Sequence, residues 1–266
     1  MGTFAIDTSQ GVERFAGLYN DSLTPSYNAV ISLIFGTLYI EILRKQKLMV
    51  PVIARIAFVL TLFVTVFILK ITITKSGVLM FVVFLMMWIG LYKRKSYVII
   101  PLIIIGGYYI YTISEPVQKR MTAEIEFVKE GTFSMEYARS MGSGRVGTWE
   151  RVLTYYSQDF DLFQKLFGNA RSFGAHNQYI VYLMRAGLVG LTVFLTILLR
   201  FYWQLIYLYR KYKQPDIYMT IVLLTIIAVC GLTQHSFDYT TLLWYLMIML
   251  SLINVYTYKS SRQISS

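Results

Sequence analysis

Apolar residues in this chain gather into long runs separated by polar connections. Each run measures about 16 to 25 residues, the length at which an α-helix crosses a hydrocarbon layer of ~30 Å. Backbone N–H and C=O groups inside lipid must pair within their own segment, which favours helices, and the runs lack the strict alternation of barrel strands. We therefore predict about seven transmembrane helices, at residues 28–43, 51–71, 77–92, 97–113, 178–202, 217–233 and 240–256.

The composition agrees with a membrane protein. Hydrophobic residues make up 56% of the 266 positions and charged residues only 15%, a balance far from that of an average soluble domain. The predicted fold class is all-α, a polytopic membrane protein. Its connections are short except for one, so the chain divides into membrane helices in 1–113, a long loop in 114–175 and further membrane helices in 176–266.

The long loop has the pattern of an ordered segment. Residues 117–130 have helical character, and 159–167 is expected to form a short amphipathic piece. Between them, apolar residues recur at spacings of three and four, which predicts one helix with a single apolar stripe. The stripe consists of Val146, Trp149, Leu153 and Tyr156. Ordered loops of this length usually carry function.

Basic residues fix the expected orientation. Alternate connections are rich in lysine and arginine and nearly free of acidic residues, whereas the opposite connections are balanced, which places the basic ones in the cytoplasm. The basic groups are Arg44, Lys45, Lys47, Lys93, Arg94, Lys95, Arg210, Lys211, Lys213, Lys259 and Arg262. The formal charge of +11 therefore reflects membrane topology, and its spread over short loops argues against a nucleic-acid partner.

This orientation places residues 1–27 and the loop 114–175 outside the cytoplasm. No basic stretch followed by an apolar segment and a small-residue cleavage site precedes them. We expect the chain to be the C-terminal portion of a longer protein with earlier helices. The one cysteine, Cys230, lies inside a predicted helix, so no disulfide forms within the chain and no cysteine metal site is expected.

Two histidines are the first candidates for chemistry. His176 and His235 both fall at extracytoplasmic ends of predicted helices. Histidine accepts a proton near neutral pH, which suits a general base. The alternative is that each histidine caps a helix or reaches the lipid–water interface, and spacing alone favours that alternative. His235 has the weaker case of the two.

Cations on the same face are the second set of candidates. The segment Met141-Gly-Ser-Gly144-Arg145 predicts a turn that leads into a helix, where free N–H groups and the arginine fork would hold an anion such as phosphate. Arg185 lies inside a predicted span, where charge is costly and usually functional. A flexible turn, a solvated side chain or a lipid headgroup contact is the default interpretation of each residue when it is taken alone. The pair Asp159 and Asp161 is interpreted as a solvated loop pair and not as a metal site.

Several of these residues together resemble a known family. His176-Asn177, nine further residues, Gly187-Leu-Val-Gly190 and then Thr192 resemble the signature of the O-antigen ligase and polysaccharide polymerase family. Weaker similarities follow the same order along the whole chain, and two of them depart from the family pattern, because a lysine replaces an arginine and a Pro-Asn pair is split. The weaker similarities are Arg14-Phe-Ala-Gly17 with Pro25 and Asn28, Thr72-Ile-Thr74-Lys75, Gly144-Arg145-Val-Gly-Thr-Trp149, and Leu166-Phe-Gly168.

The resemblance implies a metal-independent glycosyltransferase with no cofactor, in the cytoplasmic membrane of a bacterium with its site outside. The donor would be an oligosaccharide on polyprenyl diphosphate, the acceptor another glycan or a lipid, and other polysaccharide assembly proteins would be further partners. His176 would be the base, with Arg145 and Arg14 on the diphosphate. Gly187 and Gly190 would allow close helix packing beneath the site. The remaining substrate-binding candidates are Asn177, Lys75, Trp149, Gly144 and Arg185.

Two other functions stay open at this point. A transporter or lipid flippase would need charges along a path through the membrane, and Arg55 and Arg185 are the candidates for it, without any paired carboxylate inside the predicted spans. An inactive, truncated relative that serves only as a partner of other surface-glycan proteins is the third possibility. The resemblance does not separate a ligase from a polymerase, because the two differ in their acceptor.

Overall fold

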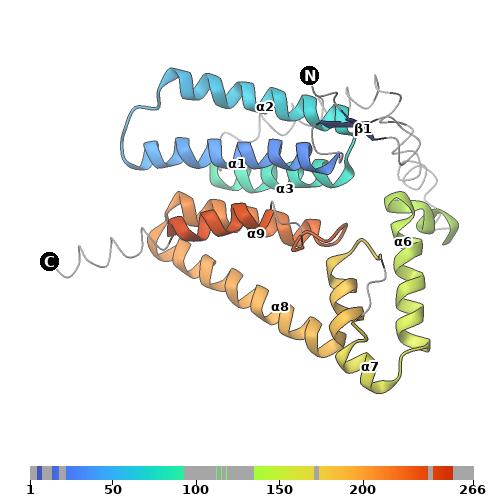
Figure 1. Ribbon diagram of the computed structural model, residues 1–266. Helices are drawn as coiled ribbons and strands as arrows, with labels where there is room; N and C mark the ends of the chain where they lie inside the picture. Colours follow the sequence, from blue (N-terminus) through green and yellow to red (C-terminus); the bar gives the residue numbers. More distant parts are fainter. Residues whose placement is uncertain are drawn as a thin grey trace. The chain divides into compact units, whose positions relative to one another are not determined.

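The computed structural model describes residues 5–7, 14–17, 22–92, 112, 115, 118, 135–170, 174–238 and 242–253 (Figure 1). The chain forms two compact units, Met1–Phe133 and Ser134–Ser266. The predicted all-α class is confirmed, and three helices are long and apolar enough to cross a membrane: α1 (Leu23–Lys45), α2 (Val52–Thr72) and α8 (Gln178–Tyr212). The protein is therefore a helical membrane protein.

The N-terminal unit is built around α1. Its helices α1 and α2 pack against each other, and α3 (Lys75–Tyr92) packs on α1 as well. The hydroxyl of Thr65 on α2 donates to the backbone carbonyl of Ala29 on α1 at 3.1 Å, so one buried polar group is satisfied across the pair. Two short antiparallel strands that the sequence did not predict, β1 (Ala5–Asp7) and β2 (Arg14–Gly17), precede these helices.

The C-terminal unit contains α6 (Met135–Gln158), α7 (Leu162–Phe167), α8, α9 (Pro215–Cys230) and a last helix, Leu242–Ile253. In Figure 1, α9 runs back from the end of α8, and the first turns of α8, which pack on α6 and α7, begin near the C-terminal end of α9. Asp161 caps α7 by accepting from the N–H of Gln164 at 2.7 Å, which is a structural role for one of the two aspartates.

Most predicted spans coincide with helices. Residues 28–43 and 77–92 lie within α1 and α3, and 51–71 lie within α2 apart from its N-cap Pro51. The span 217–233 ends early, because α9 stops at Cys230 and Gly231–Thr233 form turns. The span 240–256 overlaps the helix Leu242–Ile253. Residues 97–113, apart from Thr112, and the predicted helix 117–130, apart from Gln118, lie outside the described residues.

The span predicted at 178–202 differs most from the structure. Inside α8, Gly187 has φ 66° and ψ −169°, so the helix consists of a short part before Gly187 and a long part after it. The carbonyls of Met184 and Arg185 at this break accept from the N–H groups of Asn169 and Ala170, at 3.1 Å each. The loop after α7 thereby satisfies the backbone groups that a broken helix leaves without partners.

Glycine is required on both sides of this contact. A Cβ atom on Gly187 would overlap the carbonyl of Leu166, and one on Gly168 would overlap the carbonyl of Arg185. Gly187 therefore allows close packing of α8 on another helix, as expected, because its neighbour is the backbone of the last turn of α7. Gly190 faces Ala186 of its own helix.

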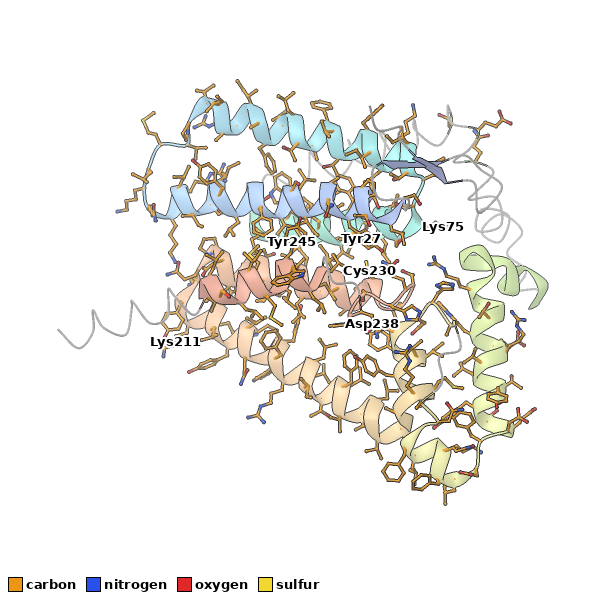
Figure 2. The ribbon with its side chains drawn as sticks, in the orientation of Figure 1. Tyr27, Lys75, Lys211, Cys230, Asp238 and Tyr245 are labelled. Atoms are coloured by element: carbon orange, nitrogen blue, oxygen red, sulfur yellow. The ribbon has the colours of Figure 1, made fainter. Side chains whose placement is uncertain are left out.

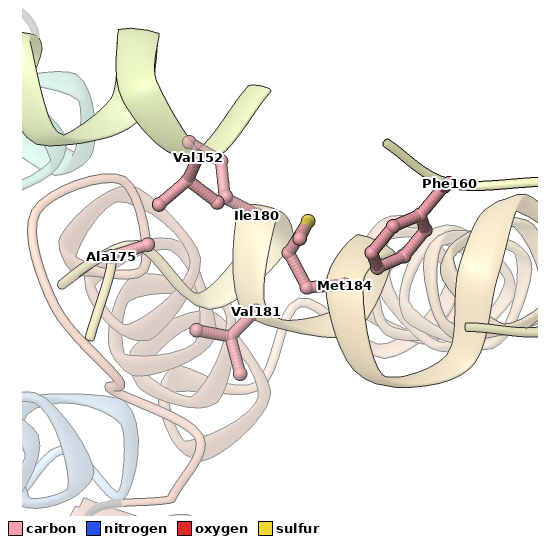
Figure 3. Close-up of a cluster of buried hydrophobic side chains, with 6 residues drawn as sticks. All are labelled: Val152, Phe160, Ala175, Ile180, Val181 and Met184. Carbon is pink, nitrogen blue, oxygen red and sulfur yellow. The ribbon is translucent and has the colours of Figure 1, made fainter. Parts of the chain in front are cut away.

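The short part of α8 packs into a small core with α6, which Figure 3 shows in close-up. Trp149 and Tyr156 of α6 border this core, but Leu153 is 41% exposed and Val152 is buried in its place. The predicted stripe is thus rotated by about one position along α6. The six buried side chains are Val152, Phe160, Ala175, Ile180, Val181 and Met184.

Candidate functional site

His176 lies in the short connection that enters α8. Its backbone adopts a left-handed conformation, with φ 45°, that residues other than glycine rarely adopt. The preceding residue, Ala175, is fully buried, and its carbonyl accepts from the indole N–H of Trp149 at 2.6 Å. The imidazole itself is exposed. The packing on both sides of His176 therefore holds its backbone in a costly conformation while the ring faces outward.

Asn177 is the N-cap of α8. Its side-chain oxygen accepts from the N–H groups of Tyr179 and Ile180, at 3.0 and 3.1 Å, which satisfies two donors at the helix start. Its amide nitrogen donates to the carbonyl of Leu232 at 3.0 Å. Asn177 is buried, so this geometry gives it a positioning role for His176, and its predicted contact with substrate stays a prediction.

The second histidine lies next to the first. The rings of His176 and His235 have their centroids 6.0 Å apart, with 39° between their planes. His235 belongs to the turn that follows α9, and Asp238, at the end of this turn, is labelled in Figure 2. The sequence offered less support to His235 as a catalytic candidate. No local pattern reveals that the turn after α9 folds back next to the connection that enters α8.

Gln178 fastens this turn to the start of α8. Its backbone N–H donates to the carbonyl of Gly231 at 2.8 Å. Its side-chain oxygen accepts from the N–H of Phe237 at 3.2 Å, and its side-chain nitrogen donates to the carboxylate of Asp238 at 3.3 Å. Together with the bond from Asn177 to Leu232, these contacts fix both histidines in one frame.

The charges around the two rings favour neutral imidazole. Partial burial lowers the pKa of His176 below its ordinary value of 6.5, and the positive charge of Arg145 lowers it further. Burial is also the main cause that lowers the pKa of His235, with His176 and Arg185 acting in the same direction and Asp238 opposing them. Both rings are therefore mainly neutral at pH 7, the state that accepts a proton.

The remaining site predictions fall in both units. Arg145 and Trp149 lie on α6, and Arg185 is exposed on α8 just before the break at Gly187. Arg14 begins β2 and Lys75 begins α3, both in the N-terminal unit. That these two share a site with His176 stays a prediction.

The predicted turn before Arg145 lies within α6, which spans Met135–Gln158. Gly144 has a left-handed φ of +77°, so the helical conformation is interrupted immediately before Arg145. That free N–H groups at this interruption hold an anion stays a prediction. Among the described residues, no group of three or more His, Cys, Asp or Glu side chains could hold a metal ion.

The hydrogen bond of Trp149 yields a first prediction. Trp149→Phe removes the donor to Ala175 and is expected to cost about 1 to 2 kcal/mol of stability, since a buried carbonyl loses its partner. Because Ala175 precedes His176, the pKa of His176 should change as well. NMR titration of the histidines and thermal unfolding measure the two effects.

Tyr156→Phe is the matched control for Trp149→Phe, since it deletes another bond from α6 to a backbone carbonyl, that of Lys165 at 2.7 Å. It should reduce stability to a similar extent and leave the His176 titration unchanged. Equal titration curves for both variants would contradict the role given to Trp149.

No protein-family model and no curated protein matches this sequence.

Proposed function

We propose that this protein is a membrane glycosyltransferase of the O-antigen ligase and polymerase type. It would transfer a glycan from polyprenyl diphosphate to a glycan or lipid hydroxyl at the extracytoplasmic face of a bacterial cytoplasmic membrane. The observation that supports the proposal most is that the charge of Arg145 acts on the exposed, mainly neutral imidazole of His176 and lowers its pKa beyond the effect of burial. A proton acceptor and a permanent cation at one place suit a reaction in which a hydroxyl attacks and an anion leaves.

The proposed chemistry uses each group once. The neutral imidazole of His176 takes the proton from the acceptor hydroxyl as its oxygen forms a bond to the anomeric carbon of the donor. The bond from this carbon to the diphosphate oxygen breaks, and the electron pair stays on the diphosphate. Arg145 stabilises that developing negative charge through its fixed fork of donors. No metal ion is needed for these steps.

The arrangement of the C-terminal unit supports this chemistry in a membrane setting. The long part of α8 is apolar enough to cross a bilayer, and the connection with His176 directly precedes the short part of α8. A polyprenyl donor keeps its chain in lipid and its diphosphate at the lipid–water boundary, so a base near the end of a membrane helix would reach it. Which side of the membrane this end faces is part of the proposal.

A transfer assay with the purified chain tests the proposal. The donor is lipid-linked glycan extracted from cells that lack this protein, and the readout is the release of polyprenyl diphosphate together with a longer or newly attached glycan. Wild-type protein in lipid nanodiscs should catalyse both. A protein that binds the donor, or moves it across the bilayer, without breaking the glycosyl bond would contradict the proposal and favour a transporter.

Arg145→Gln is expected to lower the transfer rate by about 10²-fold or more, the usual effect of removing one group that stabilises a developing anion. Arg151→Gln, on the same helix α6 and exposed, is the matched control and should keep the wild-type rate. Both variants are compared at equal amounts of folded protein by size exclusion. Equal rates for the two variants would remove Arg145 from the mechanism.

A further inference from the structure

We propose that His235 receives the proton that His176 takes from the acceptor hydroxyl, so that the two imidazoles form a relay. The inference rests on the proposed function and adds a positioning and proton-accepting residue to it. Its geometric basis is the 6.0 Å separation of the ring centroids. That separation accommodates one bridging water between ring nitrogens, with hydrogen bonds of about 2.8 Å on each side.

The position of His235 is built by the fold. The turn after α9 is held at the start of α8 by Asn177 and Gln178, through the bonds to Leu232, Gly231, Phe237 and Asp238. The hydroxyl of Ser236 also donates to the carbonyl of Ile227 at 2.6 Å. Residues on both sides of His235 are thus fixed to α8 and α9, so the ring cannot move away from His176 without breaking several hydrogen bonds.

One ring nitrogen of His235 makes no hydrogen bond to the described part of the protein. Its Nδ1 atom is buried and has no hydrogen-bond partner among the described residues. A buried polar atom without a partner destabilises a fold and therefore needs an explanation. A histidine kept only for packing would be replaced at no loss by an apolar residue.

The charges give the relay a direction. Arg145 disfavours an imidazolium at His176, whereas the carboxylate of Asp238 favours one at His235. Arg185 of α8 opposes the charged form of His235, as does a charged His176. Tyr182 of α8, which interacts with Asp238 and Arg185, is the further titratable group beside this cluster. Burial lowers the pKa of both rings, and in addition Arg145 opposes a proton on His176 while Asp238 favours one on His235.

The transfer balances in two steps. First, an N–H bond of the His176 imidazolium breaks as an N–H bond forms on His235, and His176 regains its free electron pair. Second, the His235 imidazolium gives the same proton to the solvent. His176 is then neutral again before the next acceptor binds, and no oxidant, reductant or metal ion takes part.

His235→Ala and His235→Gln test the relay, with Leu232→Gln as the control because Leu232 is 49% exposed in the same turn. Rates are measured from about pH 5.5 to pH 9 in the transfer assay, with and without added imidazole. Both His235 variants should lose about tenfold or more at pH 7, a fraction of what a general base contributes. Free imidazole should restore much of the rate of His235→Ala, and the control should behave as wild type.

Two outcomes would overturn the relay. Wild-type rates for both His235 variants at every pH would show that His235 takes no part. A loss of rate that imidazole does not relieve in folded His235→Ala would show a purely structural role. Failure of the proposed function looks different, since His176→Ala would then also keep the wild-type rate. If only the relay is wrong, His176→Ala is inactive while His235→Gln stays active.

Discussion

Replacing His176 by alanine is expected to lower the rate of glycan transfer by about 10² to 10⁴-fold, the contribution of a positioned general base. Alanine removes the proton acceptor but keeps the backbone, which Trp149 and Asn177 hold from either side. The protein should therefore still fold and insert, and only the chemical step should be lost. The measurement is the initial transfer rate with saturating acceptor, at equal amounts of folded protein.

The pH dependence distinguishes a base from a structural residue. The reaction needs neutral imidazole, and the pKa of His176 lies below its ordinary value of 6.5 because of partial burial and Arg145. The wild-type rate should thus be constant near pH 7 and fall only as the pH drops through that lowered pKa. Removing the charge in Arg145→Gln should raise the pKa of His176 and move the fall in its residual rate to higher pH.

Asn177→Ala serves as a comparison, because it removes the helix cap but leaves the base in place. It should reduce stability by about 1 kcal/mol and keep measurable transfer. If His176→Ala transferred glycan as fast as the wild type, the assignment of the base would be wrong, and with it the proposed function.

Replacing Gly187 by alanine is expected to cost about 3 kcal/mol of stability or more. The conformation at φ 66° and ψ −169° is one that residues with a Cβ atom avoid. The new methyl group would also overlap the carbonyl of Leu166. Either α8 straightens or the loop after α7 moves away, and both changes break the hydrogen bonds from Asn169 and Ala170.

Thermal unfolding in detergent measures this effect, with Leu188→Ala as the control. Leu188 is the next residue of α8 and is 53% exposed, so its truncation should change stability by less than about 0.5 kcal/mol. A Gly187→Ala variant that unfolds at the temperature of the control would show that the break in α8 is not fixed by this contact.

Hydropathy was enough to predict the long helices but not the break within one of them. Residues 178–202 are read as a single apolar run because glycine is common inside membrane helices. What breaks α8 is the loop after α7, whose N–H groups replace the lost helical partners. Such a contact depends on tertiary structure, and no periodicity in the run reveals it. The shift of the apolar stripe from Leu153 to Val152 has a similar origin, since the partner surface decides which face of α6 is buried.

Only part of the candidate site could be predicted, because the rest of it also depends on tertiary contacts. His176 and Arg145 stand in motifs that are visible in the sequence, and the structure gives them an electrostatic contact within one unit. His235 stands in no motif, and only the folding of the turn after α9 onto α8 brings it near. Burial and charge in the fold are what set the pKa of each ring, and neither quantity can be read from residue types alone.

Helices α8 and α9 are joined at both ends, by the short connection between Tyr212 and Pro215 and by the hydrogen bond from Gln178 to Gly231. They therefore form a closed loop of backbone, made of the two parts of α8 and of α9. Adding one residue to α9 alone would rotate everything after it by about 100° and shift it by about 1.5 Å. Such an insertion would move His235 away from His176 unless another part of the loop changed with it.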